Sequence, residues 1–122
     1  MQAEKKQKVL ITGSSGFLGS HLADVMDDSG YDVILFDLIS SKYKRDSQTE
    51  IIGNITNMED INKAMSDCTY VFHFAGQADI NQSSENVSQT IESNIIGTQN
   101  ILGASINNKI ERLLFASTIY VY

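Results

Sequence analysis

Four residues stand at spacings that suggest a particular chemistry. Gly13, Gly16 and Gly19 follow one another at intervals of three, and the carboxylate of Asp37 lies 24 positions beyond the first of them. A glycine between a strand and a helix permits a tight turn, and a second one leaves room for a pyrophosphate at the helix N-terminus. That end of a helix offers free N–H groups and about half a positive charge. A carboxylate at this distance can accept hydrogen bonds from ribose hydroxyls.

A strand, a helix and a second strand must position these residues. Residues 7–12 are mostly apolar or β-branched, as in a buried strand, and residues 13–28 then carry apolar side chains at helical spacing. Gly30 is a natural stop for that helix, and a second strand is predicted over residues 32–36. The glycines alone would equally suit an ordinary loop, and Asp37 alone a strand-end turn. The elements on either side favour a dinucleotide-binding turn.

The segment Thr12–Gly19, Thr-Gly-x-x-Gly-Phe-Leu-Gly, resembles the cofactor loop of the extended short-chain dehydrogenase/reductase family. This family includes nucleotide-sugar epimerases and dehydratases. The resemblance covers about residues 7–122 and implies an α/β fold, a Rossmann-type doubly wound parallel sheet of strand order 3-2-1-4-5, with NAD as cofactor. It also implies that residues 1–122 are an incomplete, truncated NAD(P)-binding domain without the substrate-binding part.

A third strand and turn are predicted over residues 50–57, with Asn57 as the cap of the next helix. The resemblance implies that Asn54 stands where the family has an aspartate against the adenine ring, with Ile55 as the apolar contact beside it. An amide oxygen can still accept a hydrogen bond from the adenine amine, so the contact can survive. The alternative is that Asn54 only shapes a turn.

A fourth strand is predicted over residues 69–76, ending in small residues. Ala75 and Gly76 could let the backbone pass beside a pyrophosphate and the nicotinamide ribose. His73 is interpreted as a packed strand histidine with a hydrogen-bonded ring rather than as a catalyst or ligand. Ala78 occupies the position where the resembling 4-epimerases have a lysine, which leaves the identity of the sugar nucleotide open.

Residues 84–107 read as one long segment with a helical apolar stripe. Gly97 costs a helix interior about 1 kcal/mol relative to alanine, so a close approach to the sheet or cofactor is expected there. The resemblance implies that Asn94 faces the active site and holds backbone or water in place, and the alternative is a solvent-facing asparagine. The stripe consists of Val87, Ile91, Ile95, Ile96, Ile101 and Leu102.

The final residues, 112–122, read as a fifth strand that runs into a turn resembling Ser-(Ser/Thr)-x-x-Val-Tyr-Gly. The resemblance implies that Thr118 is catalytic, with its hydroxyl on the reacting oxygen of the substrate, and that Ser117 is the small residue before it. Ile119-Tyr120 stands where the dehydratases have Asp-Glu, so their elimination chemistry is not supported. The Tyr-x-x-x-Lys pair that supplies the family's base is expected beyond residue 122.

The glycine turn and the resemblance together predict one set of cofactor-binding residues and no metal site. The set is Gly13, Ser15, Gly16, Phe17, Leu18, Gly19, Asp37, Leu38, Asn54, Ile55, Phe74, Ala75, Gly76, Asn94 and Ser117.

The loop after Asp37 bears on cofactor choice. A 2′-phosphate beside this carboxylate would bring like charges together, so NAD(H) is expected over NADP(H). Lys42, Lys44 and Arg45 are the nearest cations, and they reach the ribose only if the loop folds back. The simpler interpretation of these three residues is a solvated basic face.

The composition of the chain disfavours some classes of binding partner. The net charge of −6 and only nine Lys and Arg disfavour nucleic acid or an anionic membrane surface, and the N-terminus lacks the apolar core of a signal peptide. Cys68 is the only cysteine and is expected to fill space in the core, which is compatible with a reducing, cytoplasmic environment. The uncovered edge of the fifth strand predicts self-association, with a homodimer as one form.

Three functions remain open at this point. The first is an enzyme fragment, the NAD-binding portion of a nucleotide-sugar epimerase-like oxidoreductase whose substrate partner is a nucleotide-sugar. The second is a non-catalytic module that binds a dinucleotide or pairs through its exposed edge. The third is a reductase of the extended family that acts on a non-sugar carbonyl.

Overall fold

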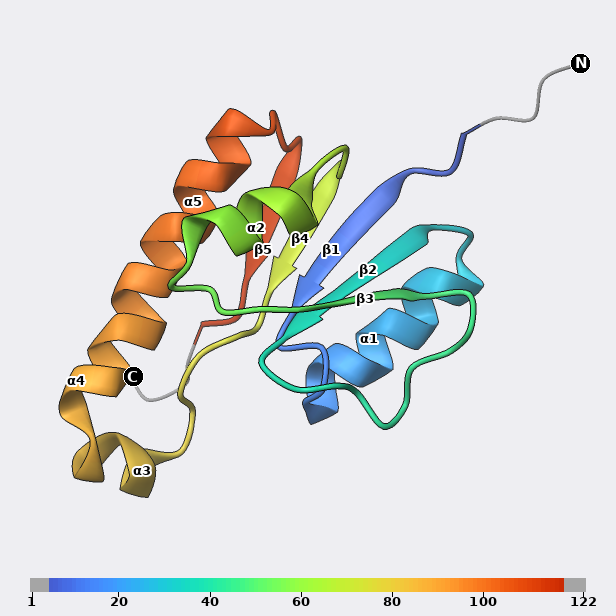
Figure 1. The fold of residues 1–122 in the computed structure, drawn as a ribbon. Helices are drawn as coiled ribbons and strands as arrows, with labels where there is room; N and C mark the ends of the chain where they lie inside the picture. The colour runs from blue at the N-terminus through green and yellow to red at the C-terminus, as the bar shows by residue number, and fades with distance from the viewer. Residues whose placement is uncertain (1–4, 118–122) are drawn as a thin grey trace, which may run out of the picture.

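The computed structural model describes residues 5–117. Five parallel strands form one sheet in the order β3-β2-β1-β4-β5, as Figure 1 shows. The predicted Rossmann-type topology is therefore confirmed. The strands are β1 (Lys8–Thr12), β2 (Asp32–Asp37), β3 (Thr49–Ile52), β4 (Tyr70–His73) and β5 (Arg112–Phe115).

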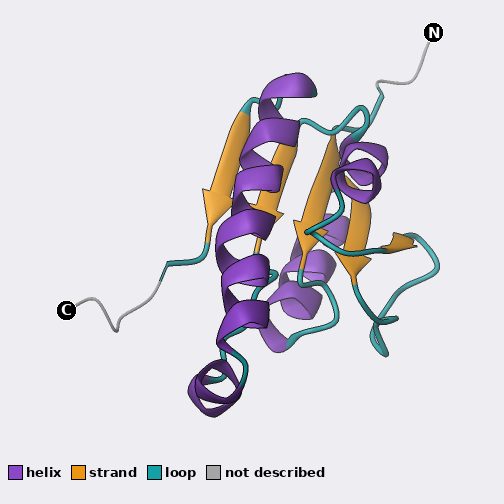
Figure 2. Ribbon diagram, turned by 60° about the vertical axis from the view of Figure 1, so that its left-hand side comes forward, coloured by secondary structure: helices purple, strands orange, loops and turns teal. Residues whose placement is uncertain are grey.

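Helices cover both faces of the sheet. Helix α1 (Phe17–Asp28) packs on one face, and helices α2 (Met58–Met65) and α5 (Gly97–Asn107) pack on the other (Figure 2). Because side chains alternate along a strand, Val9 contributes to the cluster under α1 and Leu10 to the cluster under α2 and α5. Residues 9–11 of β1 and 33–36 of β2 are all apolar and buried because both faces of these strands are covered.

The helix ends follow the predicted signals. Gly30 has a φ of +90° just beyond the C-cap of α1, which is a conformation that glycine adopts without strain. The side chain of Asn57 accepts hydrogen bonds from the N–H groups of Glu59 and Asp60, so it caps α2 as predicted. Helix α1 begins at Phe17, so the glycine turn, residues 13–16, is not helical, and Gly19 lies in the first turn of the helix.

The long segment predicted over residues 84–107 is divided in the structure. It comprises α4 (Val87–Ile91), a π-helical segment η1 (Glu92–Ile96) and α5, and a separate helix α3 (Ile80–Glu85) precedes it. Asn86 makes the break with φ −135° and ψ 80°, and its side chain accepts a hydrogen bond from the N–H of Gln89 to start α4. Local capping therefore separates α3 from α4, whereas the backbone stays right-handed helical from α4 through η1 into α5.

The predicted apolar stripe is mostly exposed rather than buried. Only Ile101 is in the core, whereas the other five stripe residues are 41–60% exposed. Figure 1 shows that α3 and α4 lie beyond the carboxyl ends of the strands, which accounts for the exposure of Val87 and Ile91 on α4. Among residues 5–117, no helix is long and apolar enough to cross a bilayer.

Candidate dinucleotide-binding cleft

A cleft of about 360 Å³ opens at the carboxyl ends of the strands. The order β2-β1-β4 puts a topological switch between β1 and β4, because the chain leaves these two strands toward opposite faces of the sheet. Open parallel sheets bind ligands at such a point. The lining comes from the glycine turn, from the segments after β2, β3 and β4, and from α4 and η1.

The glycine turn is shaped by close backbone contacts. Gly13 has a φ of +71°, and a Cβ there would lie 2.8 Å from the carbonyl carbon of Phe74. A Cβ at Gly19 would lie 2.3 Å from the carbonyl oxygen of Gly13, so Gly19 packs on the turn itself rather than on the sheet. A Cβ at Gly16 would meet only that same oxygen, at 3.4 Å. No side chain caps the N-terminus of α1, so its first N–H groups remain available for an anion.

Asp37 faces the glycine turn, although it is 22 residues from Ser15 in sequence. Its Oδ2 accepts hydrogen bonds from the backbone N–H (2.9 Å) and the hydroxyl of Ser15, and its Oδ1 accepts from the N–H of Leu38 at 2.7 Å. Three of the roughly four acceptor positions of the carboxylate are thus used. Two ribose hydroxyls could bind only if the Ser15 hydroxyl released Oδ2.

In the segment after β3, Asn54 shapes a turn, which was the alternative to the predicted adenine contact. Its Oδ1 accepts hydrogen bonds from the N–H (2.9 Å) and the hydroxyl (2.8 Å) of Thr56, so the amide oxygen is occupied within the turn. Asn54 still lines the cleft beside Ile55. Ile55 explains Gly97, because a Cβ at this glycine would lie 2.4 Å from the Ile55 Cδ1. The expected close approach at Gly97 is therefore a contact with this side chain.

Asn94 holds backbone, which is one of the roles expected for it. Its Oδ1 accepts from the N–H of Gln77 at 2.6 Å, and its Nδ2 donates to the carbonyl of Gln77 at 3.0 Å. A Cβ at Gly76 would lie 2.7 Å from the same Oδ1. The π-helical segment η1 thereby clamps the loop after β4.

Ten of the fifteen predicted cofactor-binding residues line this one cleft. They are Gly13, Ser15, Gly16, Asp37, Leu38, Asn54, Ile55, Phe74, Ala75 and Gly76. Asn94 and Ser117 instead line an adjoining cavity, and Gly19 is buried beneath the turn. Phe17 and Leu18 are outside the cleft, with exposed fractions of 82% and 55%. Thr118, the predicted catalytic residue, lies outside the described residues.

Three lining residues from α4 and η1 were missed from the sequence: Gln89, Glu92 and Ser93. Only Asn94 in this region had a motif to identify it. Gln89 lies in α4, and Glu92 and Ser93 begin η1. π-Helical turns are frequent at functional sites. No residue pattern in the segment signalled that these three side chains would reach the cleft.

The adjoining cavity has a volume of about 790 Å³ and lies between the end of β5 and helices α3 and α4. His73 lies at its base, 1% exposed, and burial lowers the pKa of its ring to about 4. The interpretation of His73 as a packed, hydrogen-bonded histidine is confirmed. Burial also raises the pKa of Cys68 to about 12, so this core cysteine is a neutral thiol near pH 7.

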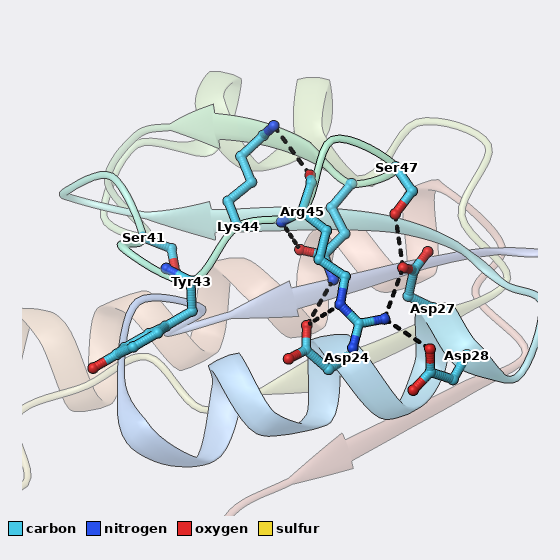
Figure 3. Close-up of polar contacts among 9 residues, drawn as sticks. Asp24, Asp27, Asp28, Ser41, Tyr43, Lys44, Arg45 and Ser47 are labelled. Atoms are coloured by element: carbon cyan, nitrogen blue, oxygen red, sulfur yellow. Dashed lines mark hydrogen bonds and ion pairs between the residues drawn. The ribbon is translucent and has the colours of Figure 1, made fainter.

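The basic loop after β2 is only partly the solvated face that was expected. Arg45 contacts three carboxylates on α1: its Nε lies 3.1 Å from Asp24, and one terminal nitrogen lies 3.2 Å from Asp27 and 2.7 Å from Asp28 (Figure 3). A hydrogen bond from Ser47 and the contacts with Arg45 hold the pKa of Asp27 below its usual value. Arg45 is therefore directed to α1 and not to the ribose end of the cleft. Among the described residues, no group of three or more His, Cys, Asp or Glu could hold a metal ion.

The parallel sheet, the glycine turn and the acidic end of β2 define a Rossmann-type nucleotide-binding domain. A sequence profile of the NAD dependent epimerase/dehydratase family matches residues 9–122. The chain belongs to that family.

Individual relatives agree with this assignment. Protein CapI of Staphylococcus aureus is 36% identical over 94% of this chain and 39% of its own length. The structure of the Thermotoga maritima UDP-glucose 4-epimerase with UDP-glucose superposes with a TM-score of 0.87 at 31% identity, over 92% of this chain and 38% of that one. The Thermus thermophilus UDP-glucose 4-epimerase in complex with NAD gives 0.85 at 28%, over the same shares. The chain therefore spans about two fifths of the length of these relatives and corresponds to their N-terminal portion.

Proposed function

We propose that this chain is the NAD-binding portion of a nucleotide-sugar epimerase-like oxidoreductase. One observation carries the proposal: the open Gly16 and the uncapped N-terminus of α1 lie beside the carboxylate of Asp37. A dinucleotide needs both features, an anion site for its pyrophosphate and an acceptor for its ribose. The relatives solved with NAD and with UDP-glucose support the choice of cofactor and substrate class.

The residues present fit the pyrophosphate and the two riboses of NAD, whereas the Asn54 amide oxygen that would meet the adenine amine is held by Thr56. The N–H groups at the start of α1 would bind the pyrophosphate, and Asp37 would accept from the adenosine ribose. The backbone at Ala75 and Gly76 borders both the cleft and the adjoining cavity, where a nicotinamide ribose would pass from one to the other. Bound NAD would supply hydride transfer with a sugar carbon, and in an epimerase the hydride returns to the other face.

The chemistry of the substrate falls to residues beyond the described part of the chain. Thr118 is proposed to hydrogen-bond the reacting oxygen, with Ser117 as the small residue before it. In the family that the sequence resembles, a Tyr-x-x-x-Lys pair supplies the base, and residues 1–122 contain no such pair. Residues 1–122 are therefore proposed to be a cofactor-binding domain that does not complete the active site.

A matched pair of glycine substitutions tests the proposed function. Gly16→Ala puts a methyl group into the space for the pyrophosphate, whereas Gly103→Ala adds one within α5, 3.4 Å from the Met58 Cε and outside the cleft. Overpacking costs about 1–3 kcal/mol, so calorimetry should show NAD binding weakened about tenfold or more by Gly16→Ala alone. No NAD binding by the unmutated chain at millimolar concentration would refute the proposal.

A second candidate function is a non-catalytic module that binds a dinucleotide or associates with itself. Exposed apolar side chains at the carboxyl end of β5 favour this candidate, since Leu114 is 41% exposed and Phe115 is 59% exposed. A reductase acting on a non-sugar carbonyl is a third candidate, which Ala78 in the place of the 4-epimerase lysine leaves open. A longer reading frame that continues into Tyr-x-x-x-Lys would favour the enzymes over the module.

A further inference from the structure

The ring of His73 is hydrogen-bonded on both sides. His73 ends β4 in register with Thr12, the last residue of β1. Its Nδ1 lies 2.7 Å from the hydroxyl of Thr12, and its Nε2 lies 3.2 Å from the hydroxyl of Thr98 on α5. A neutral imidazole has one donor and one acceptor nitrogen, so the two hydroxyls decide which is which.

The hydroxyl of Thr12 must donate to His73. Its oxygen already accepts hydrogen bonds from the N–H groups of Phe74 (3.0 Å) and Ala75 (3.1 Å), the first of which is shared with the Thr12 carbonyl. A hydroxyl has two lone pairs and one proton. With both lone pairs engaged, the proton goes to Nδ1, which is therefore the acceptor nitrogen.

The hydroxyl of Thr98 requires the same assignment from the other side. It donates to the carbonyl of Asn94 at 2.7 Å, so it is free to accept the N–H of His73 Nε2. Both neighbours thus select the neutral Nε2–H tautomer. No other described residue that lines the adjoining cavity carries a titratable side chain, and Phe115 lies over the ring at a centroid distance of 6.0 Å.

These bonds connect two walls of the cleft. Thr12 lies directly before the glycine turn, and its hydroxyl holds the N–H groups at the end of β4. The chain of bonds ends at the backbone carbonyl of Asn94, and the side-chain amide of the same residue clamps the backbone of Gln77. Because the Thr12 oxygen already accepts two N–H groups, a change of the His73 tautomer would place the Nδ1–H against the Thr12 O–H, with two donors facing each other.

We propose that His73 is a positioning residue: as a fixed Nε2–H tautomer it joins Thr12 under the glycine turn to Thr98 and Asn94, and so sets the spacing of the phosphate and nicotinamide sides of the cleft. The effect of His73 on the phosphate and nicotinamide sides rests on the proposed function. The hydrogen-bond relay itself concerns the chain without any ligand.

The test uses histidine-selective ¹⁵N NMR of residues 1–122. The chain has two histidines, and His21 is exposed and serves as the reference. Between pH 5.5 and 8, which is above the pKa of about 4 for His73, its ring should show one Nε2–H tautomer with a slowly exchanging proton. A mixture of tautomers, or an Nδ1–H form, overturns the relay.

A variant set tests the coupling. Thr98→Val removes the hydroxyl at nearly constant volume, and Thr98→Ser restores it. Ser105→Ala is the matched control, because its hydroxyl donates to the carbonyl of Ile101 with the same four-residue spacing on α5. Thr98→Val should speed hydrogen exchange at the amide of Gln77 and weaken NAD binding about threefold to tenfold, the range of one net hydrogen bond. Thr98→Ser and Ser105→Ala should leave both unchanged.

The outcomes separate the two proposals. If Thr98→Val leaves the exchange at Gln77 and the NAD affinity unchanged, the relay is refuted while the proposed function stands. If the tautomer and the exchange behave as expected but no variant binds NAD, the relay stands and the proposed function fails.

Discussion

The selection of NAD over NADP can be worked out from the surroundings of Asp37. Its carboxylate is half-buried and accepts three hydrogen bonds, which hold it in place at the ribose end of the cleft. A 2′-phosphate on the adenosine ribose would lie within a few ångströms of it. The guanidinium of Arg45 is paired with three carboxylates of α1, so it does not offset this repulsion.

The size of the effect follows from Coulomb's law. Two unit charges about 4 Å apart repel by about 1 kcal/mol in water and by about 4 kcal/mol at an effective dielectric constant of about 20. A half-buried site lies between these limits, so about 2 kcal/mol is expected, which is about a thirtyfold preference for NAD. Asp37→Ala should weaken NAD binding and reduce this ratio toward one.

The assay is the ratio of the two dissociation constants by calorimetry at one salt concentration, because salt screens the repulsion. Asp46→Ala is the control, since Asp46 is an exposed carboxylate of the same loop that does not line the cleft. Equal or tighter binding of NADP by the unmutated chain would show that the basic loop, and not Asp37, decides the choice.

Four further predictions concern turnover, association, the loop and pH. The 122-residue chain should show no epimerase, dehydratase or reductase turnover, because it contains no Tyr-x-x-x-Lys pair and general acid–base catalysis alone contributes about 10²–10⁴-fold to the rate. Hydride transfer to any nucleotide-sugar would contradict this. It should associate through the Leu113–Ala116 edge or the exposed apolar helix surface, and a clean monomer in sedimentation at tens of micromolar would count against that. Arg45→Met should lower the melting temperature more than Lys42→Met, because three carboxylates on α1 lose their common partner. The pKa of His73 is lowered to about 4 in the folded chain, so between about pH 4 and 6.5 only the unfolded chain binds a proton at this ring. Urea unfolding should therefore give a free energy of unfolding about 2 kcal/mol smaller at pH 5 than at pH 7. The same difference should appear in His21→Ala and be absent in His73→Leu.

Much of the fold could be predicted because its signals are local. The glycine turn needs a positive φ at Gly13 and close contacts at Gly19, and these requirements are visible as residue types. Apolar runs marked the strands, and Asn57 and Gly30 marked helix ends. The glycine turn and the family resemblance together predicted fifteen cofactor-binding residues, of which ten line one cleft.

Some site details could not be predicted because the local residue types allowed more than one role. Nothing near Asn54 showed that Thr56 would occupy its amide oxygen, since a short turn and an adenine contact need the same residue types. Glu92 and Ser93 line the cleft from the start of η1, and no motif in this segment marked them as site residues.

By itself the sequence determined the positions of the strands, of the phosphate turn and of the acidic end of β2, because these depend on backbone conformation and hydrophobic period. The strand order was predicted from the family resemblance. Only the tertiary structure decided which partners the polar side chains took. Arg45 meets Asp24, 21 residues away in sequence, and His73 meets Thr12, 61 residues away. Hydrogen bonds and ion pairs act over a few ångströms, so their partners are set once the strands and helices have packed.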